Sequence, residues 1–227
     1  MKTQLLYLEN MSCLIGQAQI QDIVQEQDTA QIVLDQTVFY PQGGGQPSDQ
    51  GIIQDDNALF QVHKVTQDQD SVVVYHTGVI QAGDFTRGQQ VALHVDPVLR
   101  ALHNRNHTAG HLLDYALHNL GYNWMPTKAY HFPQGPYVEY ATTLEQDMRE
   151  KLVKELEQAV NALVQQALPV KITLLDTNPE RRAMFIDTYQ PILCGGTHVV
   201  NTGDIGYVTI RKIKNEKGNL RVSYVVT

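Results

Sequence analysis

Residues 96–121, DPVLRALHNRNHTAGHLLDYALHNLG, mark a change of hydrophobic period in the chain. Asp96 is a good N-cap, Pro97 takes the tolerated first helical position, and Gly121 is a C-terminal stop, so the stretch predicts one long helix. At about 100° per residue its apolar side chains form one stripe, which we expect to face the core. The stripe consists of Val98, Leu102, Ala109, Leu112, Leu113, Ala116 and Leu120.

The chain before this helix has a different pattern. Short β segments such as AQIVLD, LFQVHKV and SVVVYH alternate with Gly, Asp and Gln turns, at the spacing of a small barrel or sandwich. No long helix fits there. We therefore expect a glycine-rich, barrel-like β domain over residues 1–95 and a second domain over residues 96–227.

The second domain is predicted to be α+β, with two long helices packed on an antiparallel sheet. Its second helix should run from about Leu144 to Leu168, introduced by a Thr142 and Glu145 capping box and ended by Pro169. The strands are expected at YVEYA, VKITLLD, GYVTIRKI and LRVSYVV. A short helical piece is expected near NPERRAMF.

Composition limits the classes of protein. The chain has 227 residues, of which 42% are hydrophobic and 18% charged, as in globular proteins. Two cysteines, Cys13 and Cys194, are too few for a disulfide scaffold. With no apolar run of about 18 residues and no signal-peptide pattern, we expect a cytoplasmic protein that has no membrane partner.

A net charge of −7 argues against a general nucleic-acid coat but leaves room for a local site. The stretch RKIKNEKGNLR carries five basic residues and one acid, and it could present a positive face to RNA. A solvated hairpin with lysines at its edge explains the stretch equally well. The basic residues are Arg211, Lys212, Lys214, Lys217 and Arg221.

The polar side of residues 97–121 predicts a metal site. It collects Arg100, His103, His107, His111, Asp114 and His118. Among these, His107 and His111 are i, i+4 neighbours, and the stretch CGGTH adds Cys194 and His198, whose intervening glycines permit a sharp reversal. This ligand set suits zinc, whereas a buried cysteine with unrelated histidines is the alternative. Thr108 replaces the glutamate that a zinc protease requires, which excludes that class.

Three adjacent glycines interrupt the stretch FYPQGGGQPSDQG, residues 39–51. Glycine serves where the backbone takes positive φ or approaches another group closely. The stretch is therefore either a tight turn between strands or a surface held against a ligand. It is not a Walker loop, which would end in Gly-Lys-Ser/Thr.

Three motifs in this order resemble the editing domain of alanyl-tRNA synthetase and its free-standing AlaX-type relatives of medium length. They are LDQTVFYPQGGGQPSDQG, HNRNHTAGHLL and CGGTHVVNTGDIG, and the resemblance runs from about Gln31 to Ile213. It implies a Zn2+ cofactor on His107, His111, Cys194 and His198, which would also be the catalytic centre. The implied substrate site contains Gly43, Gly44, Gly45, Gln46 and Asp49, and more weakly Thr29. Many relatives have a hydroxyl residue where this chain has Gly110.

The resemblance implies hydrolysis of the ester that joins a wrong amino acid to tRNA(Ala), with serine or glycine removed and alanine spared. A binding pocket for alanine cannot strongly reject serine or glycine, so a second site must find the error. That site could require the serine hydroxyl, with Gln46 or Thr29 as its partner. Two alternatives stay open, namely a zinc-stabilised RNA-binding module without catalysis and a metal-dependent hydrolase of a small ester or amide.

Overall fold

The computed structural model describes residues 2–26, 29–68, 70–175, 178–187 and 189–227. The chain divides into two compact units. Unit 1 consists of Met1–Gly43 and Pro47–Arg100, and unit 2 of Gly44–Gln46 and Ala101–Thr227. The division expected between residues 95 and 96 stays a prediction about where two domains meet.

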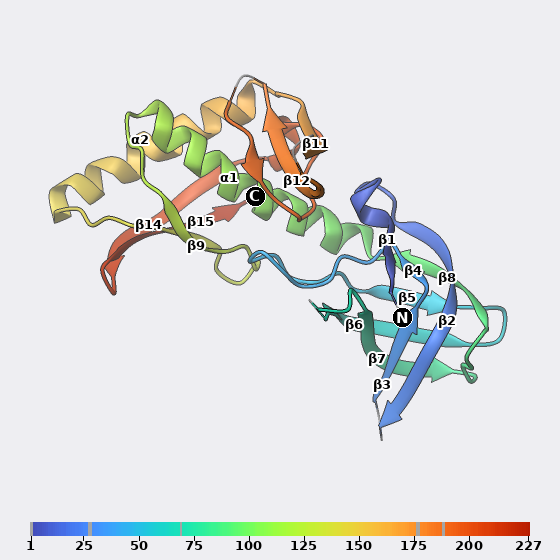
Figure 1. Ribbon diagram of the computed structural model, residues 1–227. Coiled ribbons are helices and arrows are strands. Elements are labelled where there is room, and N and C mark those ends of the chain that lie inside the picture. Colours follow the sequence, from blue (N-terminus) through green and yellow to red (C-terminus); the bar gives the residue numbers. More distant parts are fainter. Residues whose placement is uncertain (1, 27–28, 69, 176–177, 188) are drawn as a thin grey trace. The chain divides into compact units, whose positions relative to one another are not determined.

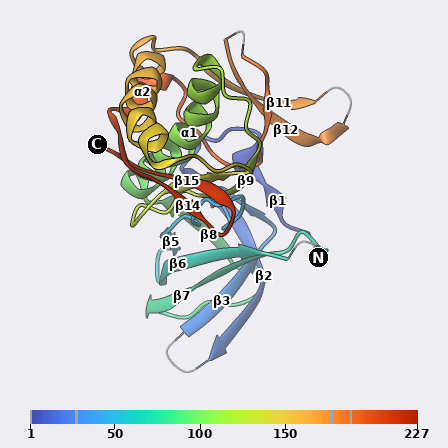
Figure 2. The same cartoon turned by 90° about the vertical axis from the view of Figure 1, so that its left-hand side faces the viewer.

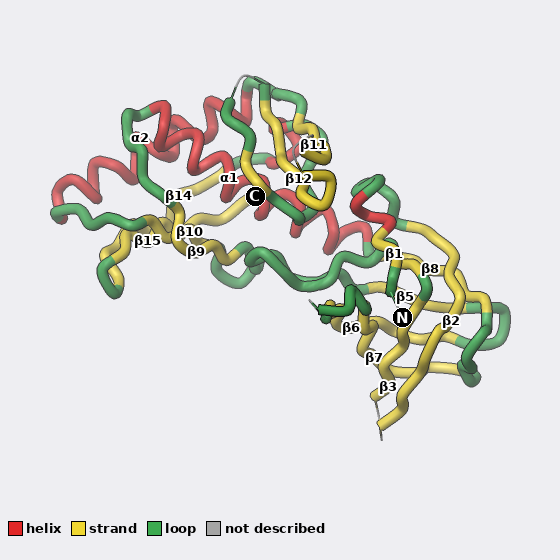
Figure 3. The backbone as a smooth tube through the Cα atoms, in the orientation of Figure 1, coloured by secondary structure: helices red, strands yellow, loops and turns green. Residues whose placement is uncertain are grey.

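Unit 1 is built around a closed barrel of six antiparallel strands, in the order β2-β3-β7-β6-β5-β8 (Figures 1 and 3). The strands are β2 (Ile15–Glu26), β3 (Thr29–Leu34), β5 (Gly51–Gln54), β6 (Leu59–Gln67), β7 (Val74–Ala82) and β8 (Gln90–Val95). Short β1 (Gln4–Leu5) pairs with β4 (Gln36–Thr37), and a 3-10 turn spans Leu6–Leu8. Alternate residues point into the barrel, as Val91, Leu93 and Val95 of β8 show. The predicted small barrel is confirmed.

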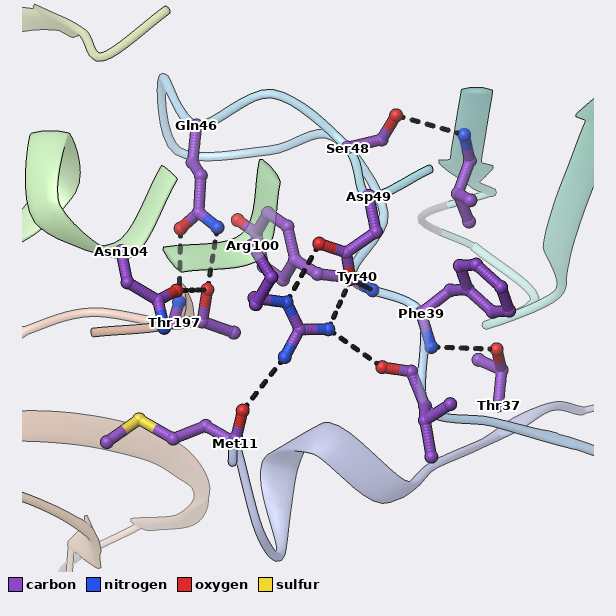
Figure 4. A network of polar contacts seen from close by, with 12 residues as sticks. Met11, Thr37, Phe39, Tyr40, Gln46, Ser48, Asp49, Arg100, Asn104 and Thr197 are labelled. Atoms are coloured by element: carbon purple, nitrogen blue, oxygen red, sulfur yellow. Dashed lines mark hydrogen bonds and ion pairs between the residues drawn. The ribbon is translucent and has the colours of Figure 1, made fainter. Parts of the chain in front are cut away.

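A buried ion pair ties the loops of unit 1 together (Figure 4). The Arg100 guanidinium, 2% exposed, bonds Asp49, which is fully buried, with Nε donating to Oδ1 over 2.8 Å. It also donates to the carbonyls of Met11 and Val38, at 2.8 and 2.9 Å. The other Asp49 oxygen accepts from the Tyr40 amide. Two desolvated charges are stable here because each has several hydrogen bonds.

Helix α1 (Pro97–Asn119) begins and ends where its capping residues predict. Oδ1 of Asp96 accepts from the amides of Val98 and Leu99 at 2.9 and 3.0 Å, and Gly121 follows the helix with φ +87°. The expected burial of Val98 is wrong, because its side chain is 74% exposed. The buried hydrophobic core of unit 2 includes α1 residues only from Ala109 onward.

Unit 2 packs α1 and α2 (Gln146–Gln165) on an antiparallel sheet in the order β14-β15-β10-β9 (Figure 2). Its strands are β9 (Pro126–Tyr130), β10 (Tyr137–Tyr140), β14 (Val208–Glu216) and β15 (Asn219–Val226). A second antiparallel sheet contains β11 (Val170–Leu175), β12 (Asn178–Ile186) and β13 (Ile192–Leu193), and a 3-10 turn spans Thr202–Ile205. The predicted α+β class is confirmed. Across the described ranges, no helix combines the length and apolarity needed to cross a membrane.

The expected capping box of α2 is wrong. Glu145 is the N-cap, and its side chain makes no hydrogen bond to the free amides there. Leu144 is held outside the helix because its amide donates to Asn215 Oδ1 at 3.1 Å and its carbonyl accepts from Asn215 Nδ2 at 2.9 Å. This contact with β14 overrides the local signal at Thr142.

The segment NPERRAMF, expected to be a short helix, lies in strand β12. Met184 and Ile186 pair with Ile172 and Val170 of β11 and are fully buried. Ladder hydrogen bonds and apolar burial decide the conformation here, which local helix propensity could not indicate.

Candidate metal centre

Helix α1 and the CGGTH loop bring four side chains together in unit 2. One ligand atom from each of His107, His111, Cys194 and His198 lies within 4.8 Å of all the others. Nε2 of His107 is 3.2 Å from Nε2 of His111 and 3.3 Å from the Cys194 sulfur, which is 3.3 Å from Nε2 of His198. Zinc bond lengths give tetrahedral edges of about 3.3–3.6 Å, so these side chains could hold a metal ion of that size.

Gln46 connects the two ligand motifs, and Figure 4 shows its two contacts with Thr197. Its Oε1 accepts from the Thr197 amide at 3.1 Å, and its Nε2 donates to the Thr197 hydroxyl at 2.7 Å. Because Oε1 is thereby fixed as an acceptor, Nδ1 of His107, 2.6 Å away, carries the hydrogen. The lone pair of His107 is left on Nε2, which faces the other ligands.

Thr108 fixes the position of the ring hydrogen of His198 in the same way. Its hydroxyl donates to the Asn104 carbonyl at 2.8 Å, and its oxygen accepts from the Val199 amide at 3.2 Å. With its single hydrogen used, the hydroxyl can only accept from Nδ1 of His198, also 3.2 Å away. Nε2 of His198 is therefore the atom with the lone pair. Thr108, which stands where a zinc protease has its glutamate, thus orients His198.

Gly196 makes room for this arrangement. A Cβ there would lie 2.2 Å from Cε1 of His107 and 2.7 Å from Oε1 of Gln46. Any side chain at this position would push apart the histidine and the glutamine that orients it. Gly196 is therefore explained by close approach, whereas a Cβ on Gly195 would meet open space, and the sharp reversal expected of the two glycines stays a prediction.

The glycine triplet of residues 43–45 also has a definite packing role. Gly45 has φ +79°, and a Cβ there would lie 2.4 Å from the Ala129 carbonyl oxygen at β9. Its own carbonyl accepts from the His131 amide at 2.8 Å. Gly44 takes φ +54° in open space, and a Cβ on Gly43 would make only ordinary contacts. Among the three glycines, Gly45 is thus the one whose close contact with the Ala129 backbone leaves no room for a side chain.

The ligand charges suit a metal. Burial opposes ionisation of Cys194, but the imidazoles of His107 and His198 lower the pKa of its thiol. Burial lowers the pKa of His198 to about 3 and also lowers that of His107. Burial alone would lower the pKa of His111, yet Asp114, whose Oδ2 is 3.9 Å from Nδ1, and the Cys194 sulfur raise it to about 9. At neutral pH the cluster is a thiolate, two imidazoles and one imidazolium.

A fourth histidine lies beside the cluster without belonging to it. The ring of His131, 2% exposed, stacks on His107 with centroids 4.7 Å apart. Burial holds its pKa well below the ordinary value, so the ring is neutral. The Tyr224 hydroxyl donates its only hydrogen to the Asn106 carbonyl at 2.8 Å. Nδ1 of His131, also 2.8 Å from that hydroxyl, must therefore be the donor to it. The ring fills the space of a side chain at Gly110, where a Cβ would lie 2.3 Å from Cε1.

Three predicted substrate residues, Gly43, Thr29 and Asp49, lie in unit 1. Thr29 is exposed at the start of β3, with its hydroxyl donating to the Glu26 carbonyl at 3.2 Å. Asp49 is committed to Arg100 and the Tyr40 amide. Their roles in substrate binding stay predictions.

Sequence reasoning missed several residues of the centre. Thr108 lies inside the HxxxH motif and could have been found there. Asn104, Thr197 and His131 carry no signal of their own, because only the fold brings them to the ligands.

A pocket of 720 Å³ lies in unit 2, and none of the four cluster residues lines it. Asp114, which faces His111, also lines this pocket, and Ile192 of its wall lies two residues before Cys194. The rings of Tyr122 and Trp124 are 4.3 Å apart there. The pocket therefore has an aromatic wall and carries a carboxylate on the side of the metal ligands.

The basic stretch in β14 and β15 is partly neutralised. Lys214 pairs with Glu216 at 2.8 Å, and Arg221 pairs with both Glu216 and Glu139. Arg211 and Lys212 are exposed and line a groove of 470 Å³ against α2 with Arg149. The positive surface is smaller than the sequence indicates.

Comparison with known proteins agrees with this geometry. Residues 3–98 match the family of tRNA synthetases class II (A), and residues 184–223 match the threonyl and alanyl tRNA synthetase second additional domain. The chain is 30% identical to the alanyl-tRNA editing protein AlaX-L of Pyrococcus horikoshii, over 89% of this chain and 52% of that protein. It is also 30% identical to the alanine–tRNA ligase of Neorickettsia sennetsu, over 100% of this chain and 28% of the ligase.

A third relative, the alanine–tRNA ligase of Aromatoleum aromaticum, is 33% identical over 86% of this chain and 24% of its own length. The chain thus spans about a quarter of these ligases and about half of AlaX-L. Fold, ligand cluster and matches together define a relative of the accessory domains of class II tRNA synthetases. More narrowly, the chain belongs to the alanyl-tRNA synthetase editing-domain family.

Proposed function

We propose that this chain hydrolyses the ester between a wrong amino acid and the 3′ end of tRNA(Ala), chiefly serine and also glycine, and spares alanine. The observation that carries the proposal is the cluster of His107, His111, Cys194 and His198. The printed name of one relative, an alanyl-tRNA editing protein, supports the substrate class. Aminoacyl esters are activated, so positioning and charge stabilisation suffice for rapid hydrolysis.

Zinc is the metal we propose for the cluster, because three imidazoles and one thiolate are its preferred donors. When bound there, zinc would supply a Lewis acid for an ester carbonyl or a water molecule. The protein's own contribution is orientation. Gln46 and Thr108 hold His107 and His198 with their Nε2 lone pairs toward the centre, and Asp114 faces Nδ1 of His111. Gln46 is thus a positioning residue in this proposal.

The acceptor end of the tRNA would enter along the pocket beside Asp114. The His111 side chain is 14% exposed, whereas His107 and His198 are buried, so we propose that the substrate reaches the centre from the His111 side. A terminal adenine base could stack on Trp124 in the pocket wall. Arg211 and Lys212 would hold phosphates, which positions the RNA without reading the amino acid.

A deacylation assay tests the proposal. The purified chain should release serine from Ser-tRNA(Ala), release glycine more slowly, and leave Ala-tRNA(Ala) largely intact. Cys194→Ala should lose the metal and slow hydrolysis on the order of 100-fold. Cys13→Ala is the matched control, since Cys13 lies in unit 1 outside the cluster. Equal rates on Ser-tRNA and Ala-tRNA would refute the editing role, and full activity without metal would refute zinc.

A further inference from the structure

We propose that Nε2 of His131 accepts a hydrogen bond from the hydroxyl of the bound seryl ester, and that Gly110 is what admits this imidazole beside the metal centre. This inference rests on the proposed function, because it names the residue that selects serine. It assigns the selection to His131, since both lone pairs of Gln46 Oε1 are already used by Thr197 and His107.

The geometry leaves one nitrogen of His131 available. Nδ1 is committed to Tyr224, and no residue in the described part of the chain bonds Nε2. The ring carbons that flank Nε2 lie against two glycines. Cε1 is 2.3 Å from the position of a Cβ on Gly110, and Cδ2 is 3.4 Å from that of a Cβ on Gly45. Nε2 therefore sits on the ring edge between two positions that have no side chain.

The chemistry of this nitrogen favours a hydroxyl donor. A neutral imidazole that is protonated on Nδ1 presents a pure acceptor at Nε2. Its ring stacks on that of His107, with centroids 4.7 Å apart, so the acceptor belongs to a ring in direct contact with a residue of the cluster. An acceptor that loses its water to a bound ester and gains no donor is unfavourable, and a seryl ester supplies the donor where alanyl and glycyl esters do not. The expected discrimination is about 10- to 100-fold.

The alternative donor is the α-ammonium group of the ester. All aminoacyl esters carry it, so an acceptor that bound it would contribute equally to serine, glycine and alanine. The ratio of the serine and glycine rates therefore separates the two donors.

The kinetic test uses His131→Phe, which keeps a stacked ring and removes the acceptor. We expect kcat/KM for Ser-tRNA(Ala) to fall about 10- to 100-fold, with less than about threefold change for Gly-tRNA(Ala) and one metal ion retained. His63→Phe, on the exposed surface of β6, is the matched control and should change neither. Equal loss on both substrates, or loss of the metal, would overturn the inference and leave the proposed function standing. A wild-type protein that hydrolyses none of the esters would overturn both.

A second measurement needs no variant. Nitrogen-15 spectra of the wild-type imidazoles should show His131 protonated on Nδ1 and bare on Nε2 at neutral pH. Titration with the 3′-seryl amide of 3′-amino-3′-deoxyadenosine should shift the Nε2 resonance, and the corresponding glycyl amide should leave it in place. A proton on Nε2 in the free protein, or equal shifts with both amides, would contradict the assignment.

Discussion

Oε1 of Gln46 lies 2.6 Å from Nδ1 of His107, although 61 residues separate them in sequence. The same glutamine bonds Thr197 through both of its amide atoms, inside the loop that carries Cys194 and His198. One side chain thus joins the glycine motif, the HxxxH motif and the CGGTH motif into a single hydrogen-bonded unit.

Gln46→Ala should weaken metal binding by about 10- to 100-fold, the usual cost of losing a partner that orients a ligand histidine. Competition with a chelator of known affinity measures the loss. Gln42→Ala is the control, since Gln42 is an exposed glutamine four residues earlier. Equal metal affinity in the two variants would show that Gln46 does not orient His107.

Thr108→Val should also weaken metal binding, because valine keeps the shape of threonine but has no oxygen for Nδ1 of His198. Thr108→Ser restores the oxygen, so it should recover most of the affinity. We expect about a tenfold gap between the two variants in the chelator assay. If serine and valine bind metal alike, the hydroxyl has no part in orienting His198.

Metal affinity should depend on the proton of His111. Its pKa is raised to about 9, so below that pH the metal-free protein carries a proton there which binding must release. Apparent affinity should therefore rise about tenfold per pH unit from 7 toward 9 and then level off. Asp114→Asn removes the carboxylate that raises this pKa, so its plateau should begin at a lower pH. Equal pH profiles in both proteins would contradict this coupling.

Gly110→Ala should destabilise the wild-type protein, because the new Cβ would meet the His131 ring at 2.3 Å. In a His131→Ala background the clash with the ring is gone and only the Tyr224 hydroxyl, 3.1 Å from the new Cβ, stays close, so the same change should destabilise the protein much less or stabilise it by up to about 1 kcal/mol, since alanine favours a helix over glycine. Thermal unfolding of the four proteins gives the coupling free energy, expected at about 1–3 kcal/mol. Additive effects would mean that the two sites do not share this space.

Adenosine monophosphate should quench the fluorescence of Trp124, the one tryptophan of the chain, if its pocket takes a nucleobase. Tyr122→Leu alters the neighbouring ring and should weaken binding severalfold. Ribose 5-phosphate, which has no base, is the control ligand. Equal quenching by both ligands would assign the effect to phosphate instead of stacking.

The four ligands could be predicted because their signals are local. His107 and His111 are helix neighbours, and Cys194 and His198 share one short loop, so spacing alone brings each pair together. The caps of α1 and the alternating strands of the barrel are local signals too.

Thr108 stands inside the HxxxH motif, but the other residues around the ligands could not be assigned their contacts, because their partners lie far away in sequence. His131 is an isolated histidine just after β9, and its place beside His107 depends on a missing side chain at Gly110. Arg100 shares a helix face with the histidines, yet its charge is committed to Asp49. Register and long-range pairing decide these positions.

Unit 2 is discontinuous, with Gly44–Gln46 joined to Ala101–Thr227. The chain between Gln46 and His107 contains strands β5 to β8, so closing this loop is a slow, entropically costly step of folding. A chain truncated before residue 101 would keep all four ligands but lose Gln46, which holds Nδ1 of His107. We expect such a fragment to bind metal weakly. Assembly of the metal centre would then depend on the N-terminal half having folded first.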